Sequence, residues 1–352
     1  MPTLPAQQLQ IFATAILQAA GVTPDEARTV AASLVESNLR GHDSHGVFRV
    51  LEYTQQLQRG DLASDAPFTV LHESPALLHA DGELGFGQIQ CARLIEQVCD
   101  KARTSGIACG TLRRSGHVGR LGEWVELAAR QGFAAFLAVN DNGFLMYVAP
   151  PGGTAPRIST NPLAIGIPTA TEPLVLDMST SAVARGKVRV AQLAGKECPP
   201  GWIQDSHGNP TTDPWAISTN PPGSLLPLGG DQGYKGFALG MLLDILTAGL
   251  SGGTCPPAPD QTETNNVLLV VWNPDRFAGH DHFRQETEKL IAWVRATPTR
   301  EGVDRILLPG DLSQETRQKR LRDGIPLPGD NWTKLVELAQ QSGVVPPTVE
   351  QP

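Results

Sequence analysis

The sequence predicts an α/β protein built from two units, one mainly helical and one in which strands and helices alternate. Apolar residues recur at helical spacing from the N-terminus to about Leu71. From His72 onward, short apolar runs that read as strands are interleaved with helical patterns. No G-x-G-x-x-G motif joins a strand to a helix, which argues against a Rossmann domain. At 352 residues the chain is long enough for two domains.

The helical unit is predicted to contain three helices, over residues 4–20, 24–39 and 48–58. The second helix has the clearest start signal. Thr23 is placed as its N-cap, Pro24 at its first position and Glu26 as the acidic member of a capping box. The third helix is predicted to end at Gly60, because glycine commonly ends a helix.

The second unit is predicted from apolar runs that are bounded by turn residues. We expect strands over residues 76–80, 107–112, 133–140, 163–169, 174–178, 188–193 and 267–273. We expect helices over residues 87–102, 122–131, 235–250, 276–296, 316–323 and 332–342. Segments 221–230 and 252–261, rich in turn residues, are predicted to be long loops.

The composition restricts the class of protein and its partners. The net charge is −8 and no dense block of Lys and Arg occurs, which argues against a nucleic-acid partner. No apolar run approaches the roughly 20 residues needed to cross a membrane, and the N-terminus lacks the pattern of a secretory signal. The five cysteines include no C-x-x-C pair, so we expect reduced thiols and a cytoplasmic protein.

Segment 40–49, RGHDSHGVFR, concentrates titratable and anion-binding groups between two predicted helices. The imidazole of His45 titrates near neutrality and suits proton transfer. On a helix, Arg49 would face the same side and hold a carboxylate in a bidentate fork; the alternative is an ion pair with Glu52 or Asp43. No acidic or cysteine cluster accompanies the two histidines of the segment, so we expect no metal site.

Segment 40–46 resembles the signature of the malate/L-lactate dehydrogenase family, whose members lack a Rossmann fold. This family also holds ureidoglycolate and sulfolactate dehydrogenases, diketogulonate reductase and cyclic ketimine reductases. Each further match is short, and their order along the chain makes the resemblance specific. The further matches are residues 115–119, 159–162, 176–181, 184–187, 208–214, 229–236 and 308–311.

The resemblance implies a fold, an activity and an assembly. The fold has a mixed-sheet, non-Rossmann α/β domain over residues 76–311 that binds NAD or NADP. A helical domain is built from both chain ends, residues 1–75 joined by 312–345. The activity is hydride transfer between NAD(P)(H) and the C2 carbon of a small 2-hydroxy or 2-oxo acid such as malate or lactate. The assembly is a homodimer with the cofactor site near the subunit interface.

Two histidines are candidates for the acid/base group. In ketimine-reductase relatives the residue matching His45 donates the proton and the residue matching Ser44 forms a relay with it. In ureidoglycolate-type relatives the residue matching His117 accepts the proton instead. The resemblance implies that Arg49 binds the substrate carboxylate. Further candidate substrate ligands are Tyr53, Thr160 and Arg185.

Cofactor contacts are predicted where glycine-rich or polar segments adjoin predicted strands and helices. The candidates are His117, Val118, Gly119, Arg120, Leu121, Asn140, Asp141, Asp177, Met178, Ser179, Gly229, Gly230, Lys235, Pro309 and Gly310. The loop before Lys235 combines open N–H groups, a helix dipole and an ammonium, which together suit a pyrophosphate. The choice between NAD and NADP stays open, because no ribose-binding carboxylate can be selected.

Two other functions remain as alternatives. A cyclic ketimine reductase would act on piperideine- or pyrroline-carboxylate, but the position matching its relay aspartate is Lys187 here. A catalytically silent homologue would require a lost motif, whereas His45, His117, Arg49 and Lys235 are all present.

Overall fold

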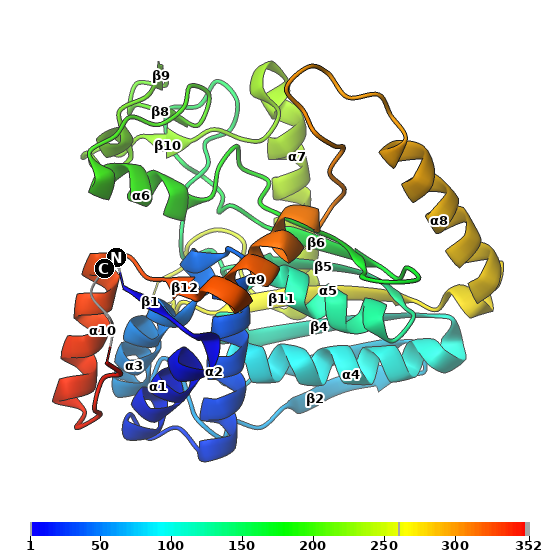
Figure 1. Ribbon diagram of the computed structural model, residues 1–352, viewed down its shortest axis with the longest axis horizontal. Helices are drawn as coiled ribbons and strands as arrows, with labels where there is room; N and C mark the ends of the chain where they lie inside the picture. The colour runs from blue at the N-terminus through cyan, green and yellow to red at the C-terminus, as the bar shows by residue number, and fades with distance from the viewer. Residues whose placement is uncertain (1, 260, 349–352) are drawn as a thin grey trace.

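The computed structural model describes residues 2–259 and 261–348, arranged as a helical unit, a central sheet and a smaller third unit (Figure 1). The helical unit contains α1 (Ala6–Ala19), α2 (Pro24–Leu39), α3 (Val50–Arg59) and α10 (Gly329–Gln341). Strands β1 (Thr3–Leu4) and β12 (Ile325–Pro326) pair within it.

The core of the helical unit draws on both ends of the chain. Leu9, Leu34, Leu335 and Ala339 have no exposed surface and belong to one apolar cluster. The second helix begins where its proline predicted, but the capping box was a wrong prediction. The carboxylate of Glu26 instead accepts hydrogen bonds from Ser64 Oγ and the Asp65 N–H, 2.7 Å away in each case. A tertiary contact therefore occupies the Glu26 side chain that the capping box would have used.

The central sheet is mixed, as expected, and has seven strands in the order β2-β3-β4-β11-β5-β6-β7. Only the pair β3–β4 is parallel. The strands are β2 (Thr69–Ser74), β3 (Leu77–Asp81), β4 (Ile107–Ser115), β5 (Ala134–Asn140), β6 (Leu163–Ile167), β7 (Leu174–Met178) and β11 (Asn265–Trp272). Strand β2 was missed, because five of its six residues are exposed and no apolar run marks it.

Helices cover both faces of the sheet. Helices α4 (Gly87–Ser105) and α5 (Leu121–Arg130) bury the main apolar core against one face. Helix α7 (Gly233–Asp244) lies on the other face, where Leu243 packs on β5 and β6. A π-helical turn (Ile245–Gly249) continues α7, so the predicted long helix is correct in extent.

The third unit has its own small core and was not predicted as separate. It contains α6 (Arg185–Ala194) and the short strands β8 (Ile203–Gln204), β9 (Pro210–Thr211) and β10 (Ser224–Leu225). The strand predicted over 188–193 is wrong, since this segment lies in α6. The β-branched residues of this segment suggested a strand. In the structure Val188 is buried and Val190 is 66% exposed, because they lie on opposite sides of a helix at the surface.

Two C-terminal helices complete the fold. Helix α8 (His280–Arg295) has no buried residue, and α9 (Asp311–Asp323) lies between the helical unit and the sheet (Figure 1). Helix α9 starts five residues earlier than predicted, directly after Gly310. Among the described residues, no helix has the length and apolar content to cross a membrane.

Candidate active site

The structure brings the two candidate histidines into contact. His45 ends a 3-10 turn (Asp43–His45) just after α2, and His117 follows β4. Their rings stack with centroids 5.4 Å apart and an angle of 22° between the planes. Because one histidine belongs to the helical unit and the other to the sheet unit, the candidate site lies where the two units meet.

Each histidine is hydrogen-bonded through its Nδ1 atom. Ser44 Oγ lies 2.9 Å from Nδ1 of His45, and the hydroxyl of Tyr53 lies 2.8 Å from Nδ1 of His117. Tyr53 is only 1% exposed, and its hydroxyl also accepts a hydrogen bond from Nε2 of Gln88 at 2.9 Å. Tyr53 was predicted to bind substrate, but its hydroxyl is occupied behind His117. Gln88 was not predicted, because nothing in its local sequence distinguishes it.

Both histidines are neutral at pH 7. Burial lowers the pKa of His45 from 6.5 to about 3, with a further contribution from the charge of Arg49. Burial and Arg49 also hold the pKa of His117 well below its ordinary value. A neutral imidazole offers one N–H donor and one lone pair, so each ring can donate or accept at the position that faces the site.

This low pKa predicts a pH dependence of stability. Between about pH 3 and pH 6.5 the unfolded chain binds a proton at His45 that the folded chain does not, so folding stability falls as the pH is lowered from 6.5. Relative to His45→Asn, the wild type is expected to lose about 1.2 kcal/mol between pH 7 and pH 5.5, and about 1.4 kcal/mol for each pH unit below that. Urea unfolding of both proteins at pH 7 and pH 5.5 measures the difference. An equal loss in both proteins would contradict the assignment.

Comparison with the variant is necessary because a buried carboxyl group acts in the opposite direction. Burial raises the pKa of Asp141 from 3.8 to about 6. Folded Asp141 therefore holds its proton over a range in which the unfolded chain has released it, and this stabilises the folded state at low pH. Asp141 is present in both proteins, so its contribution cancels from the difference.

The turn that carries His45 is held by residues far away in the sequence. Arg320 of α9 makes a two-pronged ion pair with the carboxylate of Asp43, with distances of 2.6 and 2.9 Å. The side-chain amide of Asn38 bonds Asp43 Oδ1 and the N–H of Val47. Gly46 passes so close to this amide that a Cβ atom there would collide with it. Sequence spacing gave no sign of Arg320, because 277 residues separate it from Asp43.

Removing this support is expected to weaken both stability and activity. Arg320→Ala leaves a carboxylate without its charged partner, and hydrogen bonds to charged groups are worth about 1.5–3 kcal/mol. We expect unfolding free energy to fall by about that amount and kcat to fall with it. Arg322→Ala is the matched control, because Arg322 lies on the same helix with its side chain 73% exposed. Equal effects of the two substitutions in urea unfolding would show that the Asp43 pair is unimportant.

The two candidate carboxylate ligands differ in their present contacts. Arg49 donates from Nε to the Ser44 carbonyl at 2.8 Å and forms an ion pair with Glu52. The helical spacing considered for His45 and Arg49 does not apply, since Gly46 separates two short 3-10 turns. The alternative predicted for Arg49, the pair with Glu52, is therefore present.

Arg185 is the first residue of α6, and its Nη1 atom is buried without a hydrogen-bond partner among the described residues. Its guanidinium lies over the ring of Tyr147, 5.5 Å from the centroid. A Cβ atom at Gly186 would lie 3.1 Å from Cβ of Ser44, so the start of α6 lies against the histidine turn. The third unit thus places the start of α6, with the partly unpartnered guanidinium of Arg185 seen among the described residues, against the turn that carries His45.

The predicted ligands on the sheet have mixed outcomes. The carbonyl of Thr160 accepts hydrogen bonds from the N–H and hydroxyl of Thr180. Asn140 is 2% exposed, and its side chain is occupied by Asp244, the Thr254 carbonyl and Asn266, so this residue is structural. Asp141 accepts bonds at Oδ2 from Ser159 and Leu145, whereas its Oδ1 is buried and unpartnered within residues 2–259 and 261–348.

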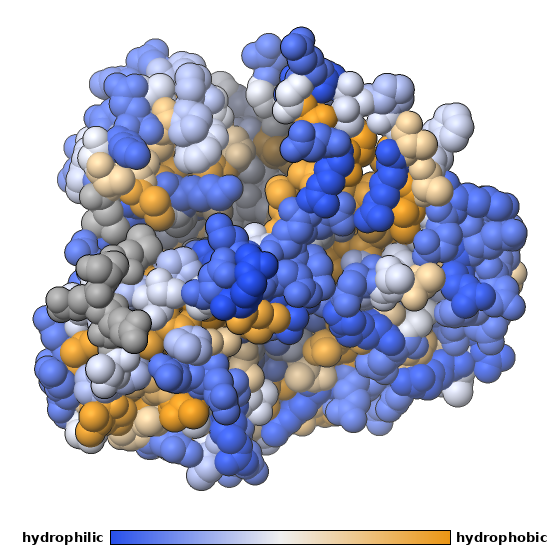
Figure 2. All heavy atoms as spheres, in the orientation of Figure 1, coloured by the Kyte–Doolittle hydropathy of each residue, from blue (hydrophilic) through white to orange (hydrophobic). Residues whose placement is uncertain are grey.

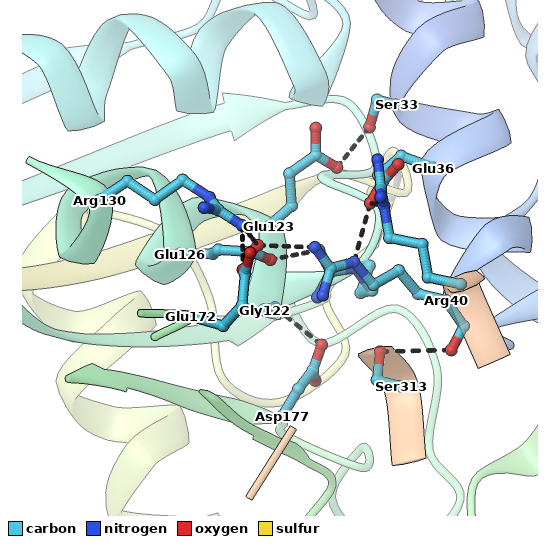
Figure 3. A network of polar contacts seen from close by, with 12 residues as sticks. Ser33, Glu36, Arg40, Gly122, Glu123, Glu126, Arg130, Glu172, Asp177 and Ser313 are labelled. Atoms are coloured by element: carbon cyan, nitrogen blue, oxygen red, sulfur yellow. Dashed lines mark hydrogen bonds and ion pairs between the residues drawn. The ribbon is translucent and has the colours of Figure 1, made fainter. Parts of the chain in front are cut away.

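The segment after His117 was predicted to bind phosphate, but most of its groups serve the fold. The side chains of Val118, Arg120 and Leu121 are 1%, 3% and 4% exposed. The carboxylate of Asp177 accepts the Gly122 N–H at 2.7 Å and so occupies the start of α5 (Figure 3). Gly119 has φ +76° and lets the chain turn into that helix.

Figure 3 also shows how α2 and α5 are joined beside the site. Arg40 bonds Glu36 at 2.8 Å and Glu126 at 2.6 Å, and its carbonyl accepts the Ser313 hydroxyl. Glu126 is further paired with Arg130. Because the Arg40 and Glu126 side chains are only 10% and 9% exposed, this contact is shielded from solvent and fixes the helical unit on the sheet unit.

The remaining predicted cofactor residues lie at two places. Gly229 and Gly230 have φ +123° and +56° and lead into α7, on which Lys235 is exposed and has no carboxylate partner in the described chain. The Pro309 carbonyl accepts the Val175 N–H at 3.3 Å, and Gly310 precedes α9. Ser179 donates to the Ser181 carbonyl, and Met178 packs on the apolar cluster beneath α7.

No group of three or more His, Cys, Asp or Glu side chains suited to a metal occurs among the residues described.

Comparison with known proteins agrees with this architecture. The family model described as malate/L-lactate dehydrogenase matches residues 4–336. The chain is 36% identical to hydroxycarboxylate dehydrogenase B of Escherichia coli (strain K12), covering 98% of this chain and 96% of the relative. It is also 36% identical to the Δ1-pyrroline-2-carboxylate/Δ1-piperideine-2-carboxylate reductase of Pseudomonas syringae pv. tomato, covering 91% of each. The solved malate dehydrogenase of Pyrococcus horikoshii OT3 has a TM-score of 0.87 and 30% identity, covering 98% and 96% of the two chains. The chain therefore belongs to the malate/L-lactate dehydrogenase family.

Proposed function

We propose that this protein interconverts a small 2-hydroxy acid and the corresponding 2-oxo acid with NAD or NADP. The observation that carries the proposal is the stacked pair His45 and His117, with the start of α6 packed against the histidine turn; Nη1 of Arg185, the first residue of α6, is buried without a partner among the described residues. A carboxylate fits such a guanidinium as a bidentate partner, and a neighbouring imidazole pair suits proton exchange with an α-oxygen. Both needs are those of a 2-hydroxy acid, whose carboxylate and hydroxyl stand on adjacent carbons.

The protein side of the reaction consists of binding, orientation and proton movement. Arg185 holds the substrate carboxylate, while Arg49 supplies additional positive charge from the histidine turn. The imidazoles of His45 and His117 face the substrate oxygen, and Ser44 hydrogen-bonds His45. When bound, a nicotinamide cofactor supplies or accepts the hydride. Fixing these groups before reaction removes much of the entropy cost of bringing them together.

The chain offers groups that fit a nicotinamide dinucleotide. The Oδ1 atom of Asp141, buried and without a partner in the described part of the chain, is an acceptor that suits the N–H of a carboxamide. The loop of Gly229 and Gly230, followed by exposed Lys235 at the start of α7, suits a pyrophosphate. We assign the nicotinamide end to the Asp141 side and the phosphates to the Lys235 side. The choice between NAD and NADP is left to the assay.

A cyclic ketimine reductase is the second candidate, favoured by the similarity to the Pseudomonas syringae reductase. Lys187 counts against it, because this exposed lysine stands where that group of enzymes is expected to have its relay aspartate. We therefore place 2-oxo acids first and cyclic imino acids second.

The test measures loss of NADH or NADPH absorbance with a panel of substrates. The panel contains pyruvate, oxaloacetate, larger 2-oxo acids and piperideine-2-carboxylate. We expect turnover of at least one 2-oxo acid, with a higher kcat/KM than the cyclic imine. Preference for the imine would select the second candidate. If no substrate is turned over and calorimetry detects no binding of either cofactor, the chain is a silent homologue.

We also propose that the protein is a cytoplasmic homodimer that uses the outer face of α7 and its continuation. Leu242, Ile245 and Leu250 are 58%, 47% and 57% exposed, and apolar side chains gather in this part of the surface (Figure 2). Such a contiguous apolar face is typical of a protein interface.

Leu242→Glu is expected to convert the dimer into a monomer in light scattering after size-exclusion chromatography. Leu290→Glu on α8, at a 63% exposed leucine, is the control; a dimer that survives Leu242→Glu would place the interface elsewhere.

A further inference from the structure

The hydrogen bonds of Tyr53 determine which nitrogen of His117 carries a proton. The phenolic oxygen lies 2.9 Å from Nε2 of Gln88 and 2.8 Å from Nδ1 of His117. The amide Nε2 of Gln88 only donates, so the tyrosine oxygen is its acceptor. The single phenolic proton then has one acceptor left, which is Nδ1 of His117. A neutral His117 bonded in this way carries its own proton on Nε2.

We propose that Gln88 and Tyr53 are positioning residues that fix His117 as its Nε2–H tautomer, so that His117 donates a hydrogen bond to the substrate oxygen while His45 exchanges the proton. This division of roles rests on the function proposed above. It resolves which of the two candidate histidines acts as the acid/base group.

The burial of this chain of groups supports a fixed arrangement. Gln88 and Tyr53 are each 1% exposed, so water does not compete for their hydrogen bonds. The ring of Tyr53 packs edge-on against Phe86, with centroids 5.9 Å apart, which restricts its rotation. Burial also holds the pKa of Tyr53 far above its ordinary value, so the phenol keeps its proton.

The two histidines differ in their connection to solvent. Behind His117, the series of hydrogen bonds ends at the buried side-chain amide of Gln88, which cannot pass on a proton. Behind His45, the hydrogen bond leads to the hydroxyl of Ser44, a residue that is partly exposed. In reduction, a bound NAD(P)H would supply the hydride to the oxo carbon, while the oxygen takes the Nε2 proton of His45. As this proton leaves, Nδ1 of His45 takes the hydroxyl proton of Ser44, and Ser44 is reprotonated by solvent, which supplies the one proton that reduction consumes.

The tautomer is measured by nitrogen NMR of protein labelled with 15N-histidine, without cofactor or substrate. The His117 signals are assigned by their loss in His117→Asn. We expect a protonated Nε2 and an unprotonated Nδ1, which give distinct 15N shifts. The opposite pattern would overturn the proposal; it would mean that the Gln88 amide is turned around, with its now unpartnered Oε1 facing Tyr53. Because no turnover is needed, this result stands apart from the test of the dehydrogenase activity.

A matched pair of variants tests the role of Gln88. In Gln88→Glu a carboxylate accepts the tyrosine proton, so the phenolic oxygen becomes an acceptor and His117 is expected to switch to the Nδ1–H form. Gln88→Met removes the donor without reversing the direction, so the Nε2–H form is expected to persist. An unchanged His117 tautomer in folded Gln88→Glu contradicts the proposed role of Gln88. If Gln88→Glu does not fold, the wild-type spectrum still decides the tautomer.

The role of His117 as a donor has its own test. Asparagine retains an N–H donor but cannot exchange a proton, whereas alanine retains neither. Losing one donor to a developing oxyanion costs about 10²- to 10³-fold in kcat. We therefore expect His117→Asn to lose less than about tenfold and His117→Ala about 10²-fold or more. Equal losses in the two variants would show that His117 does more than donate a hydrogen bond.

Discussion

His45→Asn is expected to lower kcat by about 10²- to 10⁴-fold, the usual contribution of general acid–base catalysis. Asparagine keeps a donor of similar size but cannot take the proton of Ser44 at one atom while releasing another. The loss belongs in kcat, because the substrate carboxylate is held by arginine rather than by this ring. Steady-state rates with the best 2-oxo acid measure the effect.

His117→Asn is the matched control for this prediction. Both substitutions place the same side chain at one of two stacked rings, so a general disturbance of the pair affects them alike. Only the loss of proton exchange separates them. A larger loss at His117 than at His45 would reverse the assigned roles. Circular dichroism and urea unfolding establish that each variant is folded before rates are compared.

Arg185→Met is expected to lower kcat/KM by about 10²- to 10⁴-fold. A bidentate carboxylate pair contributes two charge-assisted hydrogen bonds, each worth about 1.5–3 kcal/mol, and both are lost. The carboxylate is bound in the ground state and in the transition state, so most of the change is expected in KM. Methionine keeps an unbranched side chain against the ring of Tyr147 in place of the guanidinium, which limits the structural effect.

Arg189→Met provides the control for Arg185. It removes a positive charge from the same helix four residues away, and Arg189 is exposed and has no role in the proposed site. We expect kcat/KM to change less than about twofold, since distant exposed charges are screened by salt. Similar losses in both variants would show that helix charge, rather than the unpaired guanidinium, attracts the substrate.

The regular parts of the fold could be predicted because their apolar patterns are strong. The strand at 267–273 and the helix at 87–102 have such patterns and were predicted within a few residues. Helix α6 was mistaken for a strand because its valines imitate a strand pattern over a short segment. Thr23 is not a side-chain cap, since Glu26 is occupied by Ser64 and Asp65 instead.

The candidate site could be predicted only in part. His45 was singled out by its polar segment and Arg185 by family resemblance, and the start of α6 lies against the turn that carries His45. Gln88 and Arg320 could not have been selected, because their roles depend on contacts across 35 and 277 residues. The local sequence around Tyr53 does not distinguish a tyrosine that lines a pocket from one that is buried behind His117. The sequence therefore could not show that the Tyr53 hydroxyl bonds His117 and Gln88, and its contact with substrate stays a prediction.

The ion pair between Arg320 and Asp43 has a consequence for synthesis of the protein. Asp43 is translated 277 residues before its partner Arg320, and helix α10 follows later still. The histidine turn therefore lacks this anchor, and the helical unit lacks part of its core, until residues 311–341 have been made. A chain that ends before residue 311 contains every proposed substrate-binding residue but lacks this anchor of the turn that carries His45.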